Sequence, residues 1–178
     1  MRPHAVKFTN IKFTTIKFHM DENEINNVTD GQQAPQTLED KFTTMRQEWM
    51  TIIEELNSRM KNPPSIDSLL NDVYTKRQKA VELHGGTNAI YGKQLRAYKT
   101  KYASMYNAYK TGEKGIRYTS DSSIQIQIEA ALSGEREIIE QIREFLDYMV
   151  ETIKTIDNLI YGINTKVSIY KIMNKLDF

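Results

Sequence analysis

The stretch that decides the fold is residues 138–170, which read IIEQIREFLDYMVETIKTIDNLIYGINTKVSIY. Apolar side chains recur in it every three or four residues, as on one face of an α-helix. This face consists of Ile138, Ile142, Phe145, Met149, Ile153, Ile156, Ile160, Ile163, Val167 and Tyr170. An apolar face that continues over so many turns is typical of a coiled coil or a helical bundle. We therefore predict an all-α fold, a helical bundle with a long coiled-coil-like C-terminal helix.

The apolar face of this long helix needs a partner. One straight helix cannot bury its own face, so either the other helices of the chain fold along it or copies of the chain pack on it. The second alternative predicts a homo-oligomer, for which a closed ring is the natural form. The predicted oligomer interface consists of Ile142, Met149, Ile153, Ile156, Ile160, Ile163 and Val167.

Composition excludes several classes of protein. The 178 residues have a net charge of +1 and include no cysteine. A disulfide scaffold, a thiolate zinc site and a cysteine nucleophile are therefore excluded, and a cytoplasmic location is expected. No run approaches the ~18 apolar residues of a membrane span. The three histidines lie far apart, and no nucleophile, base and oxyanion donor come together in the sequence, so we expect no metal, no cofactor and no enzyme.

The first 36 residues differ in composition from the rest. Residues 1–19 repeat a Lys-Phe pair with a period of five and contain four basic and no acidic residues. They are either an arm that binds nucleic acid, an anionic membrane or a host protein, or an upstream extension without a function. Residues 20–36 are acidic and rich in Gln and predict a disordered tether.

Residues 37–178 are predicted to form one helical domain. Thr37 and Asp40 fit a capping box at its start. Pro63-Pro64 ends the first helix, and Gly85-Gly86 is expected to end the second. The predicted helices are about 38–61, 66–84, 88–110, 123–132 and 134–176.

Residues 85–118, here called the basic window, are the most unusual part of the sequence. They contain seven basic residues and one acidic residue, a net charge of +6, and six of the ten tyrosines. Positive charges and aromatic rings together are typical of proteins that bind single strands. The tyrosines instead could form a core beneath a solvated basic face. The window's candidate DNA contacts are Lys93, Arg96, Lys99, Lys101, Lys110, Lys114 and Arg117.

Four features follow one another in the second half of the chain. A basic, aromatic helix ends in the turn YNAYKTGEK at residues 106–114, and a short helix ends in LSGE at 132–135. A long helix comes next, and near its end Ile163 precedes Lys166 and Lys171. In order and spacing these features resemble the UvsY recombination mediators of T-even-type bacteriophages, over less than half of the chain. The family has basic residues where this chain has Ala103-Ser-Met105.

The resemblance implies a homo-oligomeric, all-helical protein that binds single-stranded DNA. Such a protein helps load a RecA-like recombinase onto strands covered by single-strand binding protein, in the cytoplasm of the infected host. It also implies that Lys166 and Lys171 join the DNA contacts of the basic window. The alternative is a structural helical oligomer, such as a virion, scaffold or adaptor component, whose apolar faces serve assembly alone.

Overall fold

The computed structural model describes residues 37–61, 65–112 and 120–173, all within one compact unit, Gln36–Phe178. The predictions for residues 1–36, the arm and the tether, lie outside the described residues. So do Lys114 and Arg117 of the basic window.

Four helices make up the described part of the chain: α1 (Leu38–Lys61), α2 (Ile66–Thr111), α3 (Asp121–Ala131) and α4 (Ser133–Met173). No strand occurs in these ranges, and the all-α prediction is confirmed. The capping box also forms: the backbone N–H of Asp40 donates to Thr37 Oγ1, and the N–H of Thr37 donates to Asp40 Oδ2, both at 3.1 Å.

The break predicted at Gly85-Gly86 is wrong, since α2 runs through it as a single helix of 46 residues. Neither glycine has a positive φ; among the described glycines only Gly112 does, at 82°. Helical side chains on both sides, such as Val73 and Thr87, are buried against the rest of the bundle. Tertiary packing therefore outweighs the low helix propensity of the glycine pair.

The continuity of α2 gives a stability prediction. A Cβ added at Gly85 or Gly86 would meet nothing within 4 Å. Each Gly→Ala change should therefore raise the free energy of unfolding by about 1 kcal/mol, measured by urea denaturation. Gly112→Ala is the matched control, because the left-handed backbone there strains any Cβ and should make the change destabilising. A loss of stability at Gly85→Ala would contradict a continuous helix.

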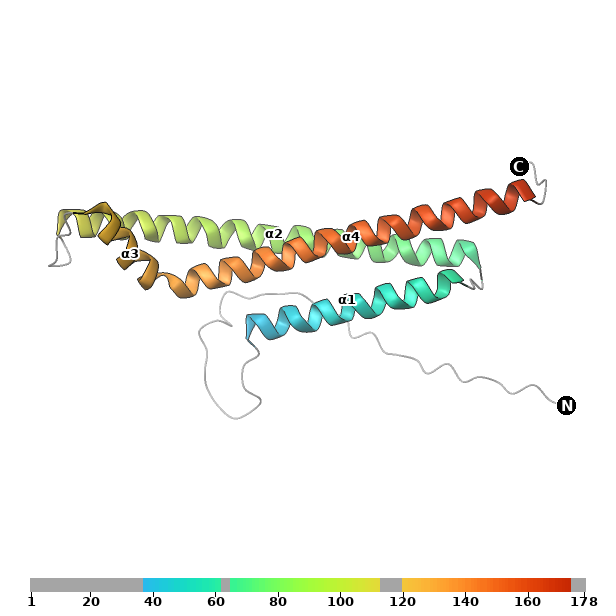
Figure 1. The fold of residues 1–178 in the computed structure, drawn as a ribbon, viewed down its shortest axis with the longest axis horizontal. Coiled ribbons are helices and arrows are strands. Elements are labelled where there is room, and N and C mark those ends of the chain that lie inside the picture. Colours follow the sequence, from blue (N-terminus) through green and yellow to red (C-terminus); the bar gives the residue numbers. More distant parts are fainter. Residues whose placement is uncertain (1–36, 62–64, 113–119, 174–178) are drawn as a thin grey trace, which may run out of the picture. The chain divides into compact units, whose positions relative to one another are not determined.

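Helices α2 and α4 run antiparallel along each other (Figure 1). Arg77 of α2 donates to Asp157 of α4 at 2.6 Å, and Lys101 of α2 donates to Glu135 of α4 at 3.0 Å. A later residue of α2 thus meets an earlier residue of α4, which fixes the antiparallel direction.

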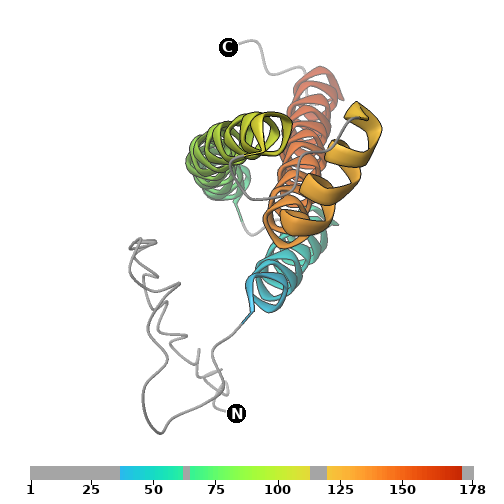
Figure 2. The same ribbon diagram turned by 90° about the vertical axis from the view of Figure 1, so that its left-hand side faces the viewer.

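Helix α1 runs parallel to α4 and packs on it (Figures 1 and 2). The Tyr148 hydroxyl donates to the Arg46 carbonyl at 2.9 Å, and Lys166 donates to the Met60 carbonyl at 3.0 Å. The Phe42 and Phe145 rings stack between the helices with centroids 4.4 Å apart. The main core, formed by α1, α2 and α4, consists of Phe42, Trp49, Leu56, Leu69, Val73, Ala80, Ile142, Phe145, Leu146, Met149, Ile156, Leu159 and Ile163.

The apolar face of α4 is largely covered within one chain. Ile142, Met149, Ile156 and Ile163 are at most 3% exposed, and they contribute to the main core. The other three predicted interface residues, Ile153, Ile160 and Val167, are half-buried and pack against the same core. Of the two alternatives for this face, the folding of other helices along it is the one that occurs in the structure.

A second, smaller core lies at the other end of α2. It consists of Ile124, Ile128 and Leu132, which are at most 4% exposed, packed against Tyr98, Tyr102, Met105, Tyr106 and Tyr109. The short helix α3 is thus attached to the tyrosines of α2. Among the described helices none is both long and apolar enough to cross a membrane.

Candidate nucleic-acid interface

Five of the predicted DNA contacts lie on the C-terminal half of α2: Lys93, Arg96, Lys99, Lys101 and Lys110. All five side chains are exposed. The whole of α2 contains eight basic and three acidic residues, a net charge of +5. Helix α4 has seven acidic and five basic residues. Positive charge in the described chain is therefore concentrated on one helix.

Two cations of the basic window form ion pairs with residues that the sequence analysis did not connect to them. The first is Lys101, whose ammonium donates to Glu135 Oε1 at 3.0 Å while its side chain stays 59% exposed. The hydrogen bond from Lys101 is the main cause that lowers the pKa of Glu135. Glu135 therefore stays ionised, and Lys101 contacts it rather than solvent alone.

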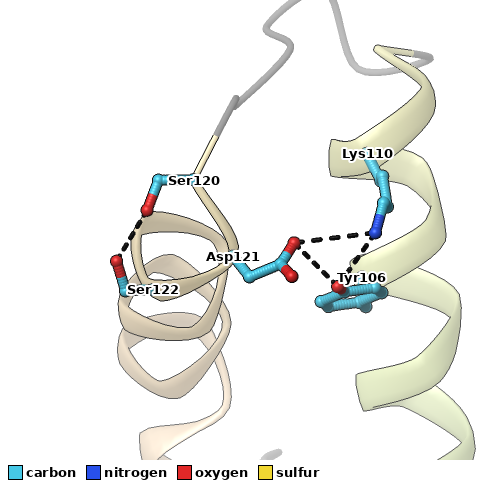
Figure 3. A network of polar contacts seen from close by, with 5 residues as sticks. All are labelled: Tyr106, Lys110, Ser120, Asp121 and Ser122. Atoms are coloured by element: carbon cyan, nitrogen blue, oxygen red, sulfur yellow. Dashed lines mark hydrogen bonds and ion pairs between the residues drawn. The ribbon is translucent and has the colours of Figure 1, made fainter.

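Lys110 forms the second pair, which Figure 3 shows at the start of α3. Its ammonium lies 3.6 Å from Asp121 Oδ1 and donates to the Tyr106 hydroxyl at 3.3 Å, and that hydroxyl donates to Asp121 at 2.9 Å. The hydrogen bond to Tyr106, followed by the charge of Asp121, raises the pKa of Lys110. We call these three residues the Lys110 network.

Arg96 and Lys99 remain as exposed cations without an ion pair among the described residues. They are three positions apart on a helix and so lie on neighbouring turns of one face. Lys93 is exposed too and has a further interaction of its own. Arg96 and Lys99 can therefore each meet a phosphate without first giving up an acidic partner among the described residues.

Five of the six tyrosines of the window lie in the described residues, and these five belong to the two cores. Tyr91 packs against the main core, while Tyr98, Tyr102, Tyr106 and Tyr109, which we call the tyrosine face, pack beneath α3. All are half-buried. In this arrangement the rings are core residues beneath a basic face, which is the second of the two interpretations of the window.

Lys166 and Lys171 lie far from the basic window. Lys166 donates a hydrogen bond to the end of α1, whereas Lys101 donates one to Glu135 near the start of α4. The 31 positions between Glu135 and Lys166 correspond to about 45 Å of helix. Within one chain the structure therefore does not bring the two sets of predicted DNA contacts together.

Comparison of the chain with protein-family models, with curated proteins and with solved structures finds no match. In the described ranges no three His, Cys, Asp or Glu residues gather where they could hold a metal ion. The described residues thus form four helices, and the longest of these, α2, has a basic, exposed segment.

Proposed function

We propose that the protein is a recombination mediator that binds single-stranded DNA and helps load a RecA-like recombinase onto strands covered by single-strand binding protein. The observation that supports this proposal is the pair of exposed cations Arg96 and Lys99 on the helix where positive charge is concentrated. Neither has an ion pair with another described residue. Neutralising phosphates releases counterions, which favours binding regardless of sequence.

The described part of the basic window offers few cations without an ion pair, so the proposal includes a homo-oligomer. Several weak sites on one assembly bind a long polyanion far more tightly than one site does. A second copy would also place another basic segment along the same strand. A protein with a net charge of +1 per chain is then able to hold DNA.

Binding of a labelled oligothymidine strand, followed by fluorescence anisotropy at low and moderate salt, tests the DNA activity. We expect the affinity for this strand to fall as the salt concentration rises. The affinity for a duplex of the same length should be lower. Mediation itself is tested by the ATP hydrolysis of a RecA-like recombinase on strands covered by single-strand binding protein, which the protein should accelerate. No binding at low salt would refute the proposal.

A structural oligomer without DNA activity is the second candidate, and the end of α4 favours it. Lys166 contacts the last turn of α1, so α4 continues beyond that helix. Past this point Ile169, Ile172 and Met173 are between 51% and 77% exposed. Such exposed apolar side chains at the end of a long helix suit a contact between copies of the chain.

This surface gives a prediction that separates assembly from folding. Changing Ile169 and Ile172 together to Asp should lower the mass in sedimentation, because paired copies would have to bury the new charges. The melting temperature of dilute protein should hardly change, since both side chains are exposed within the chain. Ile156→Asp is the contrast, because Ile156 is fully buried and its replacement should unfold the protein. An unchanged mass for the double variant would exclude this surface as the interface.

A further inference from the structure

The tyrosine face lies beneath a helix with few attachments. Within its own 11 residues α3 buries only Ile124 and Ile128, and Leu132 adds a third apolar contact just after it. By comparison α4, a helix of 41 residues, is attached by nine buried residues in total. The remaining attachment described for α3 to α2 is the Lys110 network, which is exposed to solvent and hence weak.

The sequence of α3 also stabilises it little on its own. A helix of this length is marginal in water, and its three β-branched isoleucines have a lower helix propensity than alanine or leucine. Ser120 occupies the N-cap position, yet its side chain makes no capping hydrogen bond and instead pairs with the Ser122 hydroxyl at 2.7 Å (Figure 3). Elements with so few buried contacts open locally without global unfolding.

Removal of α3 would expose a surface with the chemistry of a base-binding site. Tyr98 and Tyr102 have ring centroids 6.2 Å apart, and Tyr106 and Tyr109 continue the row along α2. Successive unpaired bases stack on such rows of rings. Lys110 lies at the edge of the row, 5.3 Å from the centre of the Tyr106 ring, and would lose its partner Asp121 when α3 leaves.

We propose that α3 is a displaceable lid over a binding site for unpaired nucleobases, formed by the tyrosine face, with Lys110 released to meet a phosphate. The proposal rests on the proposed DNA binding and deepens it. Phosphates bind first at Arg96 and Lys99, and bases reach the rings only in chains whose α3 is lifted. The apparent affinity for bases is therefore the affinity of the open form multiplied by the fraction of chains in which α3 is lifted.

A matched pair of substitutions in α3 tests the lid. Ile128 is fully buried against the tyrosines, whereas Ile126, two residues earlier, is 63% exposed. Ile128→Ala should loosen the lid and raise the affinity for oligothymidine at least ~10-fold, because the open fraction rises. Ile126→Ala should leave the affinity unchanged. An abasic strand of equal length has the phosphates without the bases. Its affinity should rise far less in Ile128→Ala, through the release of Lys110 alone, and should not change in Ile126→Ala.

A milder variant and a second measurement distinguish opening of the lid from a general loss of folding. Asp121→Asn breaks the Lys110 network without touching the apolar contacts, and it should raise affinity in the same direction by a smaller factor. Hydrogen exchange of the α3 amides in the parent protein should become faster when oligothymidine is bound, whereas an ordinary ligand slows exchange. The amides of α1 and α4 should keep their protection in every variant.

The outcomes separate this inference from the proposed function. If the parent binds neither strand, the proposed recombination mediator is refuted. The proposal that the tyrosine face binds nucleobases is then refuted with it. If the parent binds both strands equally, and α3 exchanges no faster with oligothymidine, the lid is refuted while phosphate binding stands. Faster α3 exchange together with a base-dependent gain in Ile128→Ala supports it.

Discussion

Phe145→Ala is expected to lower the free energy of unfolding by about 3 to 5 kcal/mol, the usual cost of removing a buried aromatic ring. Phe145 is fully buried, and its ring stacks on Phe42 of α1 at 4.4 Å and lies 6.3 Å from the Tyr148 ring. The cavity would open where α1 joins α4. Because native domains are stable by about 5 to 15 kcal/mol, this single change removes a large part of the total.

Denaturation in urea, followed by circular dichroism, measures this effect. Tyr161→Ala on the same helix is the control, since Tyr161 is 75% exposed and its loss should change stability by less than about 0.5 kcal/mol. A loss below about 1 kcal/mol for Phe145→Ala would show that α1 does not pack on α4 in solution.

The helical fold could be predicted because its signals are local. The apolar spacing in residues 138–170 defines α4, and the box of Thr37 with Asp40 defines the start of α1. The prediction was wrong at Gly85-Gly86, because a local propensity was weighed without the tertiary contacts on both sides of the pair, through which α2 continues as one helix.

The candidate site could be predicted only in part, for a related reason. Sequence shows that cations gather in residues 85–118, but it does not show which of them have acidic partners. Glu135 lies 34 positions from Lys101 and meets it only because α2 and α4 run antiparallel. Asp121 meets Lys110 only because α3 folds back onto α2. The distinction between paired and unpaired cations therefore required the structure.

That distinction decides which cations matter most for DNA. Arg96 and Lys99 have no acidic partner among the described residues, so their full charge faces an approaching phosphate. Lys101 and Lys110 must first exchange Glu135 and Asp121 for the ligand, which offsets much of the gain. We therefore expect the effect of substitution to be concentrated at Arg96 and Lys99.

Changing Arg96 and Lys99 together to Gln should reduce the affinity for oligothymidine about 25-fold at 0.1 M salt, because each phosphate contact on a single strand contributes ~0.7 to the slope of log affinity against log salt. The slope itself should fall by about 1.4. Helical content and the mass in sedimentation should stay as in the parent, since both side chains are exposed. The control is Lys41→Gln with Lys61→Gln, which removes the same charge from exposed cations of α1 and should alter the slope far less. Equal losses of affinity in the two double variants would mean that DNA binding depends on the net charge of the protein alone. The basic segment of α2 would then not be the binding surface.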